Sequence, residues 1–189
     1  PPYVRTGRAR PSPPEKAWTS QSERTEEFIS GNPVDLDGRT SPEKVTLSTK
    51  EWDVCLKEGD PILDMHIPAG GNMGIENVMK SFRLAKSFFE RLMPGVRHRA
   101  IVCGSWIFNP NLPEFLPSDS NLVKLLKAVR LQPCHSGPAD GLWFIFLMDK
   151  FDLKTAPRAS SLQRAIVSYL ESGRRWRCGG MFVPMDEIH

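Results

Sequence analysis

The chain has 189 residues, of which 40% are hydrophobic and 25% charged, and its formal net charge at pH 7 is +3. This composition fits one soluble domain with a hydrophobic core plus a tail. No run of about 18 apolar residues is present, so we expect no membrane span and no membrane partner. The small net charge gives no reason to expect a nucleic-acid partner, and no apolar signal-peptide region precedes the domain.

The four cysteines, Cys55, Cys103, Cys134 and Cys178, lie far apart in the sequence. They form no C-x-x-C pair and no Cys/His cluster, so the sequence predicts no metal site. Reduced thiols in a cytoplasmic protein are the simplest interpretation.

The first 43 residues are rich in proline and arginine, most densely up to Ser22, and predict a linker or extended arm ahead of a folded domain at residues 44–189. Within and after this arm, Glu26–Ile29 predicts a helical turn. Val45–Leu47 predicts a short strand. Ser48-x-x-Glu51 has the spacing of a capping box and predicts a short helix.

A strand, a glycine-rich loop and a helix then follow in direct succession. Apolar and polar residues alternate over Ile62–Ile67, as in a half-buried strand. Apolar residues recur at helical spacing over Ile75–Met93. Between them, Gly70, Gly71 and Gly74 allow tight turns at a helix N-terminus, where unpaired N–H groups favour an anion. The stretch therefore predicts a site for a phosphate-bearing ligand, although neither a Walker loop nor a complete dinucleotide fingerprint is present.

The rest of the chain predicts alternating strands and helices. They are, in order, a strand at Arg99–Phe108, a helical turn at Leu112–Leu116, a helix over Leu122–Val129 capped by Ser118, Asp119 or Ser120, a hairpin of strands at Gln132–Ser136 and Leu142–Met148, a helix over Leu162–Leu170 capped by Ser160 or Ser161, and a strand at Trp176–Met185. The first strand–helix–strand unit implies a parallel crossover. The order predicts a layered α/β or α+β domain.

Five ordered segments carry a family resemblance. They are Ile67–Gly71, Ser81–Phe89, Cys103–Pro110, Leu116–Asn121 and Ser161–Ile166. Together they resemble the GNAT-like C-terminal domain of bacterial two-domain acyltransferases, which are related to GCN5 enzymes. The resemblance covers about Val45 to Pro184.

This resemblance implies a mixed central sheet that is splayed in its middle, flanked by helices on both faces, with acyl-CoA in the cleft. Acetyl-CoA is the expected cosubstrate, without a metal. Its pyrophosphate would lie at the glycine loop, and its pantetheine arm would pair between the central strand and the strand that carries Cys103. The implied cofactor-binding residues are Ile67, Ala69, Gly70, Gly71, Asn72, Met73 and Gly74. The implied partners are an amine-bearing small molecule or peptide, which attacks the thioester directly, and an N-terminal helical domain of the same parent protein.

Transfer of an acyl group to an amine needs a base for the ammonium group and donors for the oxyanion. His66 is the predicted base, because it shares a strand face with Asp64, whose carboxylate could orient the imidazole. Cys103 and Ser105 share a face of the next strand, and either could protonate the leaving thiolate. A structural role is the competing explanation for all four residues.

Two other classes of function are open to this sequence. The segment Cys103-Gly104-Ser105-Trp106 superficially resembles the nucleophile motif of papain-type hydrolases, but serine stands where the nucleophilic cysteine would be. The stronger alternative is a non-catalytic module that keeps the fold and binds acyl-CoA or a partner domain without turnover.

Overall fold

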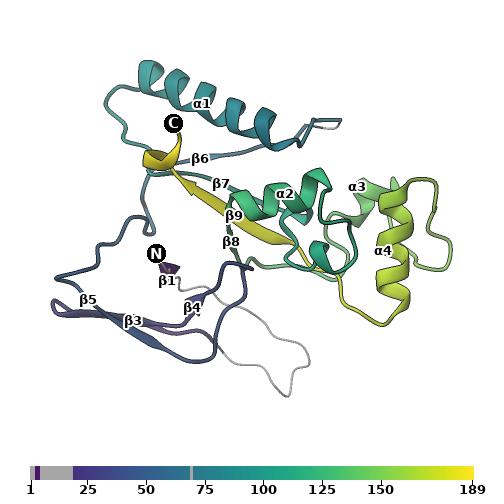
Figure 1. Ribbon diagram of the computed structural model, residues 1–189, viewed down its shortest axis with the longest axis horizontal. Helices are drawn as coiled ribbons and strands as arrows, with labels where there is room; N and C mark the ends of the chain where they lie inside the picture. Colours follow the sequence, from purple (N-terminus) through teal and green to yellow (C-terminus); the bar gives the residue numbers. More distant parts are fainter. Residues whose placement is uncertain (1–2, 5–18, 69) are drawn as a thin grey trace.

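The computed structural model describes residues 3–4, 19–68 and 70–189. Its main sheet has four strands in the order β6 (Ile62–Asp64), β7 (Ala100–Ser105), β9 (Gly179–Pro184) and β8 (Arg130–Gln132). The β6 and β7 strands are parallel, and the other two pairs are antiparallel. The predicted mixed α+β fold is therefore confirmed (Figure 1).

Helix α1 (Ile75–Leu92) connects β6 to β7, as the sequence predicts. Its buried side chains Val78 and Phe82 belong to the same core cluster as Leu63 of β6 and Ile101 of β7. The register pairs Leu63 with Ile101, so these two residues share the face of the sheet that α1 covers. Burial of this apolar stripe, more than helix propensity, holds α1 in place.

Between β7 and β8 the chain forms two 3₁₀ turns, at Trp106–Phe108 and Leu112–Glu114, and then helix α2 (Asn121–Ala128). The turn and the helix were both predicted. Of the three candidate caps, Ser120 is the one whose side chain accepts a hydrogen bond, from the backbone N–H of Val123. The predicted strand up to Phe108 ends earlier, because Ser105 turns the chain into the first 3₁₀ turn.

The predicted hairpin after β8 is wrong. Leu142–Phe146 forms helix α3, and the antiparallel partner of β8 is β9. A short apolar run can form either a buried strand or a buried helix, and its ends decide between them. Here Gly141 (φ 77°) and Leu147 (φ 54°) adopt left-handed conformations on either side of α3. A Cβ on Gly141 would lie 2.6 Å from Cδ1 of Trp106, so only glycine fits this contact.

Helix α4 (Ser161–Glu171) follows the predicted pattern closely. Ser160 and Gln163 form a capping box, in which each side chain bonds the other residue's backbone. Gly173, with φ 78°, ends the helical segment after Ser172. The chain then returns through β9 and finishes with a 3₁₀ turn at Met185–Glu187.

The N-terminal part of the chain contains strands that the sequence did not predict. A three-stranded antiparallel sheet is formed by β2 (Ser22–Arg24), β3 (Phe28–Gly31) and β5 (Val45–Ser48), of which only β5 was expected. A two-residue pair joins β1 (Tyr3–Val4) to β4 (Pro33–Val34).

Two predicted helical segments beside these strands are wrong. The expected helical turn at Glu26–Ile29 runs from the β2–β3 turn into β3, because Thr25 Oγ1 accepts the N–H groups of Glu27 and Phe28 and closes a hairpin. The expected helix after Ser48 is a turn, in which the Ser48 side chain accepts a hydrogen bond from the N–H of Lys50.

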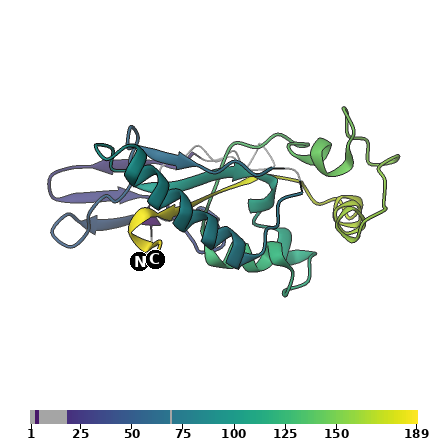
Figure 2. The same cartoon turned by 90° about the horizontal axis from the view of Figure 1, so that it is seen from above.

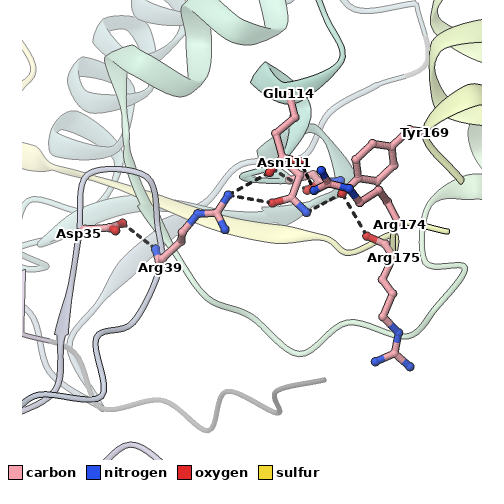
Figure 3. Close-up of polar contacts among 8 residues, drawn as sticks. Asp35, Arg39, Asn111, Glu114, Tyr169, Arg174 and Arg175 are labelled. Atoms are coloured by element: carbon pink, nitrogen blue, oxygen red, sulfur yellow. Dashed lines mark hydrogen bonds and ion pairs between the residues drawn. The ribbon is translucent and has the colours of Figure 1, made fainter. Parts of the chain in front are cut away.

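Residues 35–39 form a turn that docks against the main sheet (Figure 3). Asp35 Oδ1 accepts the backbone N–H of Arg39, and the Arg39 guanidinium bonds Asn111 and Glu114. A Cβ on Gly38 would lie 2.7 Å from Cβ of Leu131 in β8. The described part of the expected arm thus contains paired strands, and its turn at residues 35–39 contacts the main sheet. A domain boundary at residue 44 stays a prediction.

The two views show an elongated molecule, with the small β2–β3–β5 sheet at one end and α3 and α4 at the other (Figures 1 and 2). Among the described residues, none of the helices combines the length and the apolar character needed to cross a bilayer.

Candidate functional site

The β6 and β7 strands pair over only part of their length. Their parallel register ends at Asp64 and Val102, and the N–H of Met65 donates to the Val102 carbonyl at 2.8 Å. The β7 strand continues through Ser105, paired with β9 on its other side. The sheet is therefore open between the strands beyond Met65, as the resemblance implies.

Gly104 lies in this opening. Strand alternation directs its backbone N–H and C=O to the same side as those of Val102, toward β6, where the described chain has no strand opposite it. Gly104 is exposed although it lies in an inner strand, and a Cβ built on it would meet nothing within 4 Å. An extended ligand can therefore approach this edge and pair with the Gly104 backbone as an added strand would.

The glycine loop lies at the end of β6 and leads into α1. Gly70 has φ 76°, the N–H of Gly71 donates to the Pro68 carbonyl at 3.1 Å, and that of Gly74 donates to Asn72 Oδ1 at 2.9 Å. The N-cap of α1 is Gly74, which has no side chain to bond the first N–H groups of the helix. The first intrahelical acceptor is the Gly74 carbonyl, which Val78 uses, so the preceding amides are available to an anion.

The N-termini of two helices, α1 and α2, lie beside this loop. A Cβ on Gly74 would lie 3.1 Å from Asn72 Oδ1, 3.7 Å from Asn77 Nδ2 and 4.0 Å from Nδ2 of Asn121, the first residue of α2. The positive dipole ends of α1 and α2 thus meet beside Gly74. Side-chain amides and helix dipoles together favour a negatively charged group here.

The predicted cofactor-binding residues are in part explained by packing. Ile67 and Met73 are half-buried against the core. Gly70, Gly71, Asn72 and Gly74 make up the loop just described, whereas Ala69 lies outside the described residues. Their role in binding stays a prediction, which the loop geometry supports.

The predicted catalytic pair lies at the mouth of the opening. Asp64 and His66 are both exposed, and Asp64 shares a sheet face with Val102 and Gly104. No hydrogen bond or ion pair joins the Asp64 carboxylate to the His66 imidazole in the part of the chain that the structure describes. The structure places both residues beside the opening, and their catalytic roles stay a prediction.

Cys103 and Ser105 are accounted for by the fold. Cys103 is 6% exposed, lies on the sheet face of Leu63 and Ile101, and belongs to the core cluster. Burial raises the pKa of its thiol to about 11, with Asp64 and Cys134 adding smaller effects. Ser105 Oγ accepts the N–H of Ile107 and caps a 3₁₀ turn. Their predicted part in proton transfer is untested, and both have a structural explanation.

Gly104 is a candidate site residue that the sequence did not single out, although both it and Asn121 lie within the five family segments. A glycine inside an apolar strand is a known signal for a close backbone approach, so Gly104 could have been found. No local signal links Asn121 to Gly74, because their proximity depends on how α1 and α2 pack.

A comparison with known protein families identifies the family of this chain. Residues 15–182 match the model of the GNAT-like C-terminal domain. The chain is a member of this family. No curated protein matches it closely enough to identify a relative.

Solved structures similar to this GNAT-like domain are acyltransferases. One, in complex with decanoyl-CoA, has 27% identity and a TM-score of 0.59 over 86% of this chain and 45% of its own. A mutant acyltransferase in complex with octanoyl-CoA has 31% identity and a TM-score of 0.58 over 68% and 42%. A third, with decanoyl-CoA and teicoplanin, has 25% identity and a TM-score of 0.61 over 87% and 46%. The present chain therefore spans less than half the length of these neighbours.

Proposed function

We propose that this domain binds acyl-CoA in the opening between β6 and β7 and transfers the acyl group to an amine. The observation that carries the proposal is the exposed Gly104 beside the point where β6 ends, where no strand among the described residues lies opposite it. The similar acyltransferases with bound decanoyl-CoA and octanoyl-CoA support it.

In this proposal the two ends of CoA use different parts of the site. The pyrophosphate lies at the N-terminus of α1, where Gly74 leaves the first helical amides without a capping side chain. The pantetheine amides pair with the Gly104 backbone. The thioester then lies near Asp64 and Val102, where the two strands converge.

The acceptor amine attacks the thioester carbon directly, and we propose His66 as the base that removes its proton. Histidine is the side chain that most often serves as a general base in enzymes. We do not propose Cys103 as the acid. Its thiol is buried in the core with a pKa raised to about 11, so proton transfer to a CoA thiolate of ordinary thiol pKa would be uphill.

Acyl chain length and acceptor are separate parts of the proposal. The resemblance favours acetyl-CoA, while the neighbours hold eight- and ten-carbon acyl groups, so a test must include both. One neighbour holds teicoplanin, which supports a small-molecule acceptor. We also propose a cytoplasmic location and a second, N-terminal domain, as the greater length of the neighbours suggests.

The test is isothermal titration of the domain with acetyl-CoA, octanoyl-CoA and decanoyl-CoA. Gly104→Val places a branched side chain on the sheet face beside the open edge, where it would crowd the ligand, and Gly74→Asp places a capping carboxylate on the amides proposed for the phosphates. We expect each variant to weaken binding at least tenfold without lowering the melting temperature. Binding that both variants leave unchanged would exclude this site.

Matched controls make the same chemical changes elsewhere. Gly95→Val adds a side chain at another glycine whose Cβ meets nothing within 4 Å, and Ser160→Asp changes the N-cap of α4. Both should bind like the unmodified domain. If acyl-CoA binds but no amine is acylated by the domain, the non-catalytic alternative is favoured.

A further inference from the structure

The segment between β8 and β9 leaves the main sheet and returns to it with a cysteine at each end. The ladder between these strands ends at the pair Gln132 and Gly180. Cys134 lies two residues after Gln132, and Cys178 two residues before Gly180. Residues 135–177, which include α3 and α4, form the whole of the excursion between them. Figure 1 shows this excursion as the end of the molecule farthest from the small sheet.

The register of β8 and β9 points to Cys134 and Cys178 as neighbours. Paired residue numbers in this ladder have a constant sum, so the same register continued two positions past the last pair sets Cys134 opposite Cys178. Adjacent strands are about 4.8 Å apart, within the Cα separation of up to about 7 Å that a disulfide bridges. Both cysteines are half-buried and outside any disulfide.

The other two cysteines are poor partners for this pair. The Cys134 thiol is also among the smaller causes that raise the pKa of Cys103. Cys103 nevertheless lies on β7, which β9 separates from β8, so its strand is two strand spacings, about 9–10 Å, from that of Cys134. Cys55 is exposed, and its thiol interacts with Asp186, Arg99 and Arg130.

Local contacts hold Cys178 beside the returning chain. Its N–H donates to Ser136 Oγ at 2.7 Å, and its Sγ donates to the Asp140 carbonyl at 3.4 Å. Burial raises the pKa of the Cys178 thiol to about 11, and the nearby Cys134 thiol is among the smaller causes. The Cys134 thiol is thus close enough to Cys178 to affect its ionisation.

We propose that Cys134 and Cys178 form a reversible disulfide when the protein meets a small disulfide oxidant such as oxidised glutathione. One cysteine thiolate attacks the glutathione disulfide and releases one glutathione. The second cysteine attacks the resulting mixed disulfide and releases the other. Two protein thiols are oxidised, one glutathione disulfide is reduced to two glutathiones, and the thiol protons pass to the two glutathione thiolates.

The bond would close residues 135–177 into a loop. A crosslink of this span restricts the unfolded chain and stabilises the fold. The crosslink would constrain the whole excursion that holds α3 and α4, whose side chains Leu142 and Ile166 pack in the common core. This inference is independent of the proposed acyl transfer.

The test incubates the domain with oxidised glutathione and counts thiols under denaturing conditions. We expect four thiols to fall to two, a peptide that links Cys134 to Cys178 by mass spectrometry, and reversal by dithiothreitol. The melting temperature should rise by roughly 5–10 °C. Proteolysis within residues 135–177 should slow.

Single variants make the assignment specific. Cys134→Ser and Cys178→Ser should each abolish the internal crosslink and the rise in melting temperature, whereas Cys55→Ser should change neither. Four remaining thiols would overturn the proposal, as would a crosslink through Cys103 or between molecules through Cys55.

Discussion

Met65 and Val102 form the last backbone contact between β6 and β7, an N–H···O bond of 2.8 Å. Two residues further along β7, Gly104 faces the same side, and within residues 19–68 and 70–189 no strand lies against it. A parallel pair that continued past Met65 would bury this edge and exclude a ligand. The early end of pairing is therefore the structural feature on which the proposed function depends.

The affinity for acyl-CoA should fall as the side chain at position 104 becomes larger. Gly104→Ala adds only a methyl group in open space, whereas Gly104→Val adds a branched side chain on the sheet face beside the open edge. We expect a smaller loss of affinity for alanine than for valine, measured by titration calorimetry. Equal affinities for all three proteins would place the ligand elsewhere.

Replacement of His66 should impair turnover rather than cosubstrate binding. His66→Ala should lower kcat by about 10²–10⁴ with little change in the affinity for acyl-CoA, because the base acts on the acceptor amine. Steady-state kinetics with an amine acceptor, combined with titration calorimetry, separates the two effects. Unchanged kcat in His66→Ala would remove His66 from the mechanism even if the domain is an acyltransferase.

The buried thiol of Cys103 should make stability depend on alkaline pH. Its pKa is raised in the folded state from 9.0 to about 11, so the folded protein holds the proton more tightly than the unfolded chain. The resulting stabilisation is complete below pH 9 and is lost as pH rises from 9 to 11. Urea unfolding should show a loss of about 2 kcal/mol from this group. Cys103→Ala should reduce this loss, and an identical pH dependence in both proteins would contradict it.

The Tyr169 hydroxyl should stabilise the docking of residues 35–39 through Asn111. Asn111 is 6% exposed, and its Nδ2 donates to Tyr169 Oη at 2.8 Å while its Oδ1 accepts from Arg39 (Figure 3). Tyr169→Phe leaves a buried amide donor unpaired and should cost about 1–3 kcal/mol in urea unfolding.

Arg39→Ala removes an exposed partner of the same amide and should cost less, about 0.5–1 kcal/mol. A larger loss of stability for Arg39→Ala than for Tyr169→Phe would show that the exposed Arg39 contact contributes more than the buried hydrogen bond to Tyr169.

The capping box of α4 should contribute measurably to stability. Ser160→Ala removes the acceptor for the N–H of Gln163, and we expect a loss of about 1 kcal/mol in the free energy of unfolding. Ser161→Ala, at the next position, should change stability much less. Equal losses for the two variants would show that the cap does not act as the geometry suggests.

Local sequence signals were sufficient where neighbouring residues determine the conformation. The stripe of α1, the Ser160–Gln163 box and Gly173 each act within one or two turns of a helix, and these elements were predicted correctly. The three glycines indicated the loop before α1, and the family segments led to the mixed sheet.

Only the tertiary structure decided the features that depend on distant residues. Leu142–Phe146 forms a helix that begins where Gly141 packs on Trp106. The strand that pairs with β8 is β9, not this segment. Asn121 lies close to Gly74 because α1 and α2 pack with their N-termini together. The opening at Gly104 exists because β6 and β7 stop pairing after Met65. A sequence reports periodicity and caps directly, but which edges and helix ends come together depends on packing across the whole chain, and that packing shapes the site.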